Sequence, residues 1–80
     1  MAQIQVDQTL DARGLLCPMP IVKTAKAMKE LEPSQVLKLM ATDRGSITDV
    51  PAWCESTDNE LVEWHEEEDH LVFLIRKGEV

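Results

Sequence analysis

A chain of 80 residues is the size of one domain, and we expect residues 1–80 to form a single one. Apolar residues make up 44% of the chain and aromatic residues only 4%, so the core must be built from Leu, Val, Ile and Met. The net charge of −7 argues against direct binding to nucleic acid, because phosphates repel an acidic surface. No apolar run is long enough to cross a membrane, and no basic segment followed by an apolar block marks a secretion signal. We therefore expect a cytoplasmic protein with reduced cysteines and no membrane partner.

The charge is unevenly distributed along the chain. Residues 1–44 carry a net charge of +1, whereas residues 45–80 carry −8. Charge runs usually form a solvated face, so solubility is the simpler explanation of the acidic half, and docking of a partner is the alternative.

The first predicted strand ends near Asp11. Ile4, Val6 and Leu10 share one parity with mostly polar residues between them, which predicts a strand with one buried face. The loop that follows contains Gly14, which can adopt a positive φ if the turn needs it.

Residues 14–20, Gly-Leu-Leu-Cys-Pro-Met-Pro, predict a loop that turns into a helix with a cysteine at its start. Proline is favoured at the first helical position, where its missing N–H would have had no partner. This preference places Pro18 at the first helical position, Cys17 at the cap and Pro20 within the same turn.

The predicted position of Cys17 favours an anionic sulfur. The backbone N–H groups of Met19 and Ile21 would remain to point at the cap, and a helix N-terminus carries a partial positive charge. A cysteine held there is expected to have a lowered pKa and to be a thiolate more often than a free cysteine. Lys23, nearer to the sulfur than the other helical lysines, could support this charge, although a solvated lysine is the simpler interpretation.

The predicted helix buries a stripe made of Ile21, Ala25 and Met28, and it ends before Pro33. Residues 36–41 are almost continuously apolar, which predicts a central strand. A strand, a helix and a strand with this spacing form a βαβ unit, so the first two strands are expected to be parallel.

The loop after the second strand is expected to border the cysteine. In a parallel pair both loops leave the carboxyl ends of their strands at the same edge of the sheet. Asp43 and Arg44 are therefore candidates for lining the site of Cys17. The structural alternative is that Asp43 or Ser46 caps a second helix.

The second predicted helix buries Ile47, Val50, Trp53 and Cys54, which share helical spacing. Pro51 is expected to make its first turn short or irregular. A buried cysteine acts mostly as a small hydrophobe, and this interpretation of Cys54 is preferred over a second redox thiol.

Two more strands complete the predicted fold. Residues 60–66 alternate, with Val62 and Trp64 on one side, and an acidic hairpin loop at residues 66–69 leads into an apolar strand at residues 71–75. The order β-α-β-α-β-β predicts an α/β (α+β) two-layer sandwich, in which two helices cover one face of a four-stranded mixed sheet.

Only Cys17 is placed for chemistry. The sequence contains no Cys-x-x-Cys pair and no glycine-rich phosphate loop, and the spacing of His65 and His70 is not that of metal ligands, so we expect no metal and no cofactor. A single activated thiol on a small domain suits a protein that accepts a chemical group on its sulfur and passes that group to another molecule. A persulfide there would be an anion that the helix N-terminus stabilises.

Residues 10–20, Leu-Asp-Ala-Arg-Gly-Leu-Leu-Cys-Pro-Met-Pro, resemble the signature of the TusA (SirA-like) sulfur-carrier family, in which a Cys-Pro-x-Pro motif opens the first helix. The similarity continues through residues 41–43, 49–51, 53–54 and 74–78. It implies the same β-α-β-α-β-β sandwich. It also implies that Cys17 accepts sulfur as a persulfide from a cysteine desulfurase or another sulfurtransferase and passes it to a downstream acceptor protein. Family members feed tRNA thiolation, molybdenum-cofactor assembly or oxidative sulfur metabolism.

The hypothesis is a carrier that acts with partner enzymes rather than turning over alone, with Cys17 as the reactive residue. The residues expected to support it are the helix start and the nearby charges: Pro18, Met19, Pro20, Ile21, Arg13, Lys23, Asp43 and Arg44. Two alternatives remain from the sequence. One is a redox protein that pairs Cys17 with Cys54, and the other is a non-catalytic regulatory domain in which Cys17 is only a helix cap.

Overall fold

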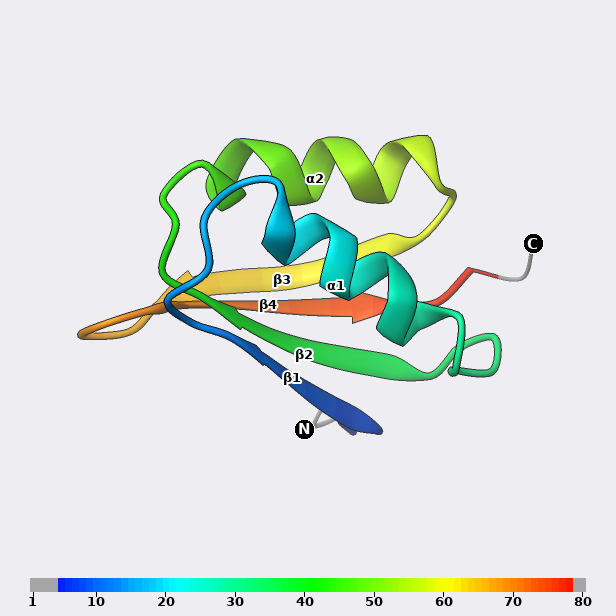
Figure 1. The fold of residues 1–80 in the computed structure, drawn as a ribbon. Coiled ribbons are helices and arrows are strands. Elements are labelled where there is room, and N and C mark those ends of the chain that lie inside the picture. The colour runs from blue at the N-terminus through cyan, green and yellow to red at the C-terminus, as the bar shows by residue number, and fades with distance from the viewer. Residues whose placement is uncertain (1–4, 79–80) are drawn as a thin grey trace.

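The structure, a computed structural model, describes residues 5–78 as a four-stranded sheet with two helices on one of its faces (Figure 1). The predicted order β-α-β-α-β-β and the two-layer α+β class are confirmed. None of the helices within these residues is long and apolar enough to cross a membrane. The elements are β1 Gln8–Ala12, α1 Met19–Met28, β2 Val36–Ala41, α2 Ser46–Ser56, β3 Glu60–Glu66 and β4 Leu71–Arg76.

The strand order β1-β2-β4-β3 brings three connections to one end of the sheet. β1 and β2 are parallel, as predicted, so the loops that leave their carboxyl ends emerge together. β4 is antiparallel to β2, and β3 is antiparallel to β4. The β3–β4 hairpin therefore lies at the same end as these two loops (Figure 1).

The core lies between the helices and the sheet. Successive side chains of a strand point to opposite faces, so alternate residues of the two central strands face the helices. These residues are the most buried apolar ones of the two strands: Leu37, Leu39, Ala41, Leu71, Phe73 and Ile75. Val50 and Cys54 of α2 complete the core from the helical layer.

The first strand differs from its prediction in extent. It continues to Ala12, which is fully buried, whereas Leu10 is only half-buried and Val6 is exposed. Ile4 lies outside the described residues. The parity of the inward face is as expected, but β1 is an edge strand, and the helices cover only the end that leads into α1.

The buried stripe of α1 is rotated from the predicted one. Pro20, Thr24, Ala27 and Met28 are buried, and Ile21 is left half-buried. A threonine can lie on the buried face here because its hydroxyl donates to the carbonyl oxygen of Pro20 at 2.7 Å. The hydroxyl is thus satisfied inside the helix, which apolar periodicity alone does not reveal.

Two further expectations are corrected in the second half of the chain. α2 continues without interruption from Ser46 to Ser56 with Pro51 inside it, so the proline does not shorten the helix. The alternation of β3 is broken by an irregularity between Leu61 and Glu63. As a result Leu61, rather than Val62, shares the core side with Trp64, whose ring stacks on Phe73 with centroids 5.9 Å apart.

We expect Leu39→Ala to lower the free energy of unfolding by about 3 kcal/mol, because it removes a fully buried side chain from a central strand and leaves a cavity. Val22→Ala on the exposed side of α1, where the valine is 51% exposed, should change it by less than about 0.5 kcal/mol. Urea unfolding followed by circular dichroism measures both. Equal losses for the two variants would contradict the assignment of this core.

Candidate functional site at Cys17

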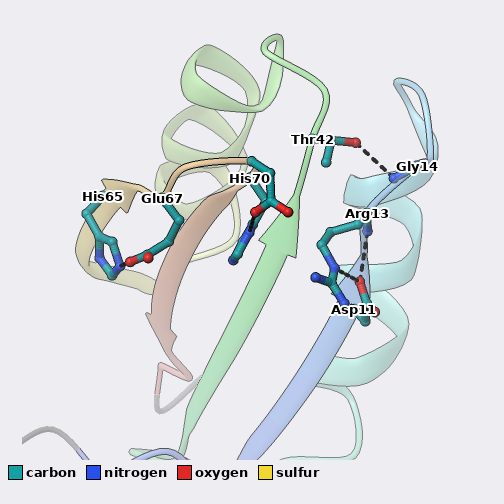
Figure 2. A network of polar contacts seen from close by, with 8 residues as sticks. Asp11, Arg13, Gly14, Thr42, His65, Glu67 and His70 are labelled. Atoms are coloured by element: carbon teal, nitrogen blue, oxygen red, sulfur yellow. Dashed lines mark hydrogen bonds and ion pairs between the residues drawn. The ribbon is translucent and has the colours of Figure 1, made fainter.

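The loop between β1 and α1 is tied to the loop that follows β2. Gly14 has a φ of 85°, a conformation that costs a residue with a Cβ about 1–2 kcal/mol. Its N–H donates to the Oγ1 of Thr42 at 2.8 Å, as Figure 2 shows. The turn at Gly14 therefore fixes where the following residues, including Cys17, stand relative to β2.

Cys17 is exposed and is held by two carboxylates from the other loop and helix. Its backbone N–H donates to the Oδ2 of Asp43 at 2.8 Å. Its Sγ lies 3.3 Å from the Oδ2 of Asp49, in the first turn of α2, and donates to it. The other oxygen of Asp43 accepts the N–H of Gly45 at 3.2 Å. The sulfur is thus fixed between the start of α1 and the start of α2.

The start of α1 is one residue later than expected, and its donors are occupied. Pro18, rather than Cys17, is the N-cap, and Met19 is the first helical residue. The N–H of Met19 donates to the carbonyl oxygen of Leu16 at 2.9 Å. The N–H of Ile21 donates to the carbonyl oxygen of Pro18 at 3.1 Å. The prediction that these two groups are free to hold a cysteine sulfur is therefore wrong.

The surroundings raise the pKa of the Cys17 thiol instead of lowering it. The largest cause is the hydrogen bond to Asp49, followed by partial loss of solvent and by the negative charges of Asp49 and Asp43. A carboxylate beside a thiol disfavours the thiolate because two like charges would stand close together. The predicted thiolate is thus corrected to a protonated thiol in the free chain. The partial charge of a helix end does not offset two carboxylates.

The basic residues expected near the sulfur are mostly bound elsewhere. Arg13 donates to Asp11 through its side chain at 2.9 Å (Figure 2), and the side-chain and backbone hydrogen bonds from Arg13 are the main causes that lower the pKa of Asp11 to about 2. Arg44 pairs with Glu66 at 2.8 Å. Lys23 is exposed on α1 and makes no ion pair with another described residue. Of the charged residues named from the sequence, only Asp43 contacts Cys17 directly.

Three large apolar side chains within five positions of the cysteine along the chain are exposed. Leu16 is 75% exposed, Met19 41% and Val22 51%. Met19 and Val22 are three residues apart and therefore lie on one side of α1. Apolar surface of this kind is typical of sites that contact other proteins. We call these three residues the apolar patch.

Sequence reasoning missed Asp49 and two members of the apolar patch. Asp49 was not among the residues expected at the site, because its position three residues after Ser46 is typical of helix capping. The signal that could have found it is its place in the first turn of the helix that follows Asp43, at the same edge of the sheet as Cys17. Leu16 and Val22 carry no such signal, because an apolar residue beside a helix start is as compatible with burial as with exposure.

The other titratable groups do not build a second centre within residues 5–78. No cluster of three or more His, Cys, Asp or Glu side chains there could hold a metal ion. His65 pairs with Glu67 at 2.6 Å, as Figure 2 shows, and His70 pairs with Asp69 at 2.7 Å. Cys54 is buried, and its burial raises the pKa of its thiol to about 11.

The chain is thus a small two-layer α+β protein with an exposed cysteine at the start of its first helix. The family model described as Sulfurtransferase TusA matches residues 8–77, and this chain belongs to that family. YrkI of Bacillus subtilis is 53% identical, with 90% of this chain and 96% of that protein covered. Sulfur carrier protein TusA of Allochromatium vinosum is 46% identical, with 90% and 95% covered. The crystal structure of a SirA-like protein from Desulfitobacterium hafniense superposes with a TM-score of 0.78 at 26% identity, with 89% and 97% covered.

We expect one of the two thiols to react in the folded protein. Iodoacetamide at pH 8 should label Cys17 once per chain, because Cys17 is exposed whereas Cys54 is only 2% exposed. Intact mass before and after unfolding in urea counts the labels, and a Cys17→Ser control should take none until it unfolds. Two labels at similar rates in the folded chain would contradict this burial.

Burial of Cys54 also predicts a loss of stability at alkaline pH. Its folded pKa of about 11 lies above the ordinary value of 9.0, so the unfolded chain releases this proton first as the pH rises. The contribution of the buried, protonated Cys54 thiol to the free energy of unfolding is complete below about pH 9. It is lost toward pH 11, which lowers the free energy of unfolding by about 2–3 kcal/mol. Urea unfolding at pH 7 to 11 measures it. The Cys54→Ala variant should lose less stability than the wild type over the same pH range. Equal slopes of the free energy of unfolding against pH for the two proteins would refute the effect.

Proposed function

We propose that this chain is a sulfur carrier and that Cys17 holds the transferred sulfur as a persulfide. The relatives from Allochromatium vinosum and Pseudomonas fluorescens are named sulfur carrier protein TusA. The observation that carries the proposal is the exposed Sγ of Cys17, fixed at the junction of both helix starts in a member of this family. An exposed and fixed sulfur can be reached by two larger proteins in turn.

The proposed loading step moves one sulfur atom between two thiols. The Cys17 thiol loses its proton, and its Sγ attacks the outer sulfur of a donor persulfide, R–S–SH. A bond forms between Sγ and that sulfur, the S–S bond of the donor breaks, and its electron pair leaves on the donor sulfur, which takes up a proton. The products are Cys17–S–SH and R–SH, so the step needs no external oxidant or reductant. Unloading is the same step with Cys17 as the donor.

The proposed partners are proteins on both sides of the transfer. The donor is a cysteine desulfurase or another sulfurtransferase, and the acceptor is a downstream protein in tRNA thiolation, molybdenum-cofactor assembly or sulfur oxidation. The apolar patch of Leu16, Met19 and Val22 beside Cys17 supports docking of a protein. The net charge of −7 supports protein partners over direct contact with RNA. Lys23, which makes no ion pair with a described residue, is free to take part in that docking.

A redox pair of Cys17 and Cys54 has less support. Both cysteines are free, and Cys54 lies in the core with a pKa of about 11. A thiol of that kind is a poor attacking group near neutral pH. Disulfide formation would require Cys54 to leave the core cluster that it shares with Val50 and Phe73.

The proposal predicts that Cys17→Ser abolishes sulfur loading and that Cys54→Ala retains it. Each protein is incubated with a cysteine desulfurase and ³⁵S-cysteine, and label on the chain is measured after non-reducing electrophoresis. Wild type and Cys54→Ala should carry label that dithiothreitol removes, because a persulfide is reducible. Label on Cys17→Ser equal to that on wild type would overturn the role of Cys17. Failure of wild type to load from every class of persulfide donor would overturn the carrier function.

A further inference from the structure

The carboxylates beside Cys17 disfavour its thiolate in the free protein, and the thiol form is a poor nucleophile. A thiol attacks sulfur through its thiolate, yet the Sγ of Cys17 donates a hydrogen bond to the carboxylate of Asp49. Asp43 adds a second carboxylate on the backbone side of the same residue. Two negative groups therefore face the position where the thiolate would have to form.

Within residues 5–78 no cationic side chain forms an ion pair with either of these carboxylates. Asp43 accepts two backbone N–H groups, from Cys17 and Gly45, whereas the described bonds of Asp49 include no cationic side chain. The arginines of the two loops are engaged with other acids, Arg13 with Asp11 and Arg44 with Glu66. In the part of the chain that the structure describes, the charged groups that act on the thiol are thus Asp43, from the loop after β2, and Asp49, from α2.

We propose that Asp49 is a positioning residue that keeps the unloaded Cys17 thiol as a hydrogen-bond donor, and that the sulfur-loading partner brings a cationic group to Asp49 to release it. This inference rests on the proposed function. Pairing of Asp49 with an arginine or lysine of the partner removes the like charge, and the thiol can then ionise beside the donor persulfide. The free carrier is guarded against stray electrophiles, and the docked carrier is reactive.

This inference assigns a chemistry to the partner. Its surface around the reacting sulfur should carry at least one exposed cation, next to apolar groups that fit the patch of Leu16, Met19 and Val22. A neutral or acidic surface would leave Asp49 bound to the thiol. Specificity for the donor would thus depend on the same contact that activates the nucleophile.

The first test measures the reactivity of Cys17 without any sulfur donor, so it is separate from sulfur loading. Rates of alkylation by neutral iodoacetamide are followed from pH 6 to 11 by the mass of the peptide that contains Cys17. Asp49→Asn should shift the titration to lower pH and speed alkylation at pH 7 on the order of threefold, because thiolate becomes more abundant while each thiolate is somewhat less nucleophilic. An unchanged profile for Asp49→Asn would overturn the role of Asp49.

Asp58→Asn is the matched control. It removes one negative charge at the opposite end of α2, where Asp58 has a φ of 60° that asparagine tolerates. Its profile should coincide with that of the wild type. An equal shift in both variants would mean that net charge, and not the contact with Asp49, sets the reactivity of Cys17, and it would refute the proposal.

The second test uses the wild-type chain and therefore does not depend on how any variant folds. Two disulfides are compared: cystamine, which carries two ammonium groups, and neutral 2-hydroxyethyl disulfide. For each disulfide, the rate of its exchange with Cys17 is divided by the rate of its exchange with 2-mercaptoethanol. The normalised rate should favour cystamine several-fold at low salt, and the preference should shrink in 0.5 M KCl as the charges are screened. Absence of a preference at low salt would overturn the requirement for a cationic partner, even if persulfide loading of Cys17 succeeds.

Discussion

Parallel pairing of β1 with β2 is the constraint on which the rest of the structure depends. A parallel pair needs a crossover, and α1 supplies it while covering the sheet. The pairing places the carboxyl ends of both strands at one edge, so the loop that carries Cys17 and the loop that carries Asp43 leave the sheet side by side. The bond between Gly14 and Thr42 then fixes the distance between those loops.

The electrostatics of the site follow from this geometry. The helix end beside Cys17 contributes roughly half a positive charge, and its first donors are used by the carbonyl oxygens of Leu16 and Pro18. The carboxylate of Asp49 lies at hydrogen-bond distance from the sulfur, and that of Asp43 lies at hydrogen-bond distance from the backbone N–H of Cys17. The carboxylates therefore decide the protonation of the thiol, and the helix end acts chiefly as a scaffold that exposes the sulfur.

Much of the fold could be predicted from local pattern. Strand β2 was predicted with its exact bounds, and the acidic segment between β3 and β4 was predicted as a hairpin loop. Both are set by composition over a few residues, which the sequence displays directly. The face of α1 that is buried was predicted less well. Thr24 lies in the core because its hydroxyl bonds within the helix, and this compensation is not visible in apolar spacing.

The sequence by itself determined the order of elements, the family resemblance and the cysteine at the junction of strand and helix, because each is a property of neighbouring residues. It also indicated that Asp43 would lie near Cys17, since parallel pairing follows from the spacing of strand, helix and strand. Only the tertiary structure decided which charges face the sulfur. Cys17 and Asp49 are 32 positions apart, and their contact depends on how two helix starts meet at one edge of the sheet. Arg13 and Arg44, which were expected at the site, are bound by Asp11 and Glu66, so the charge expected around the thiol had the wrong sign.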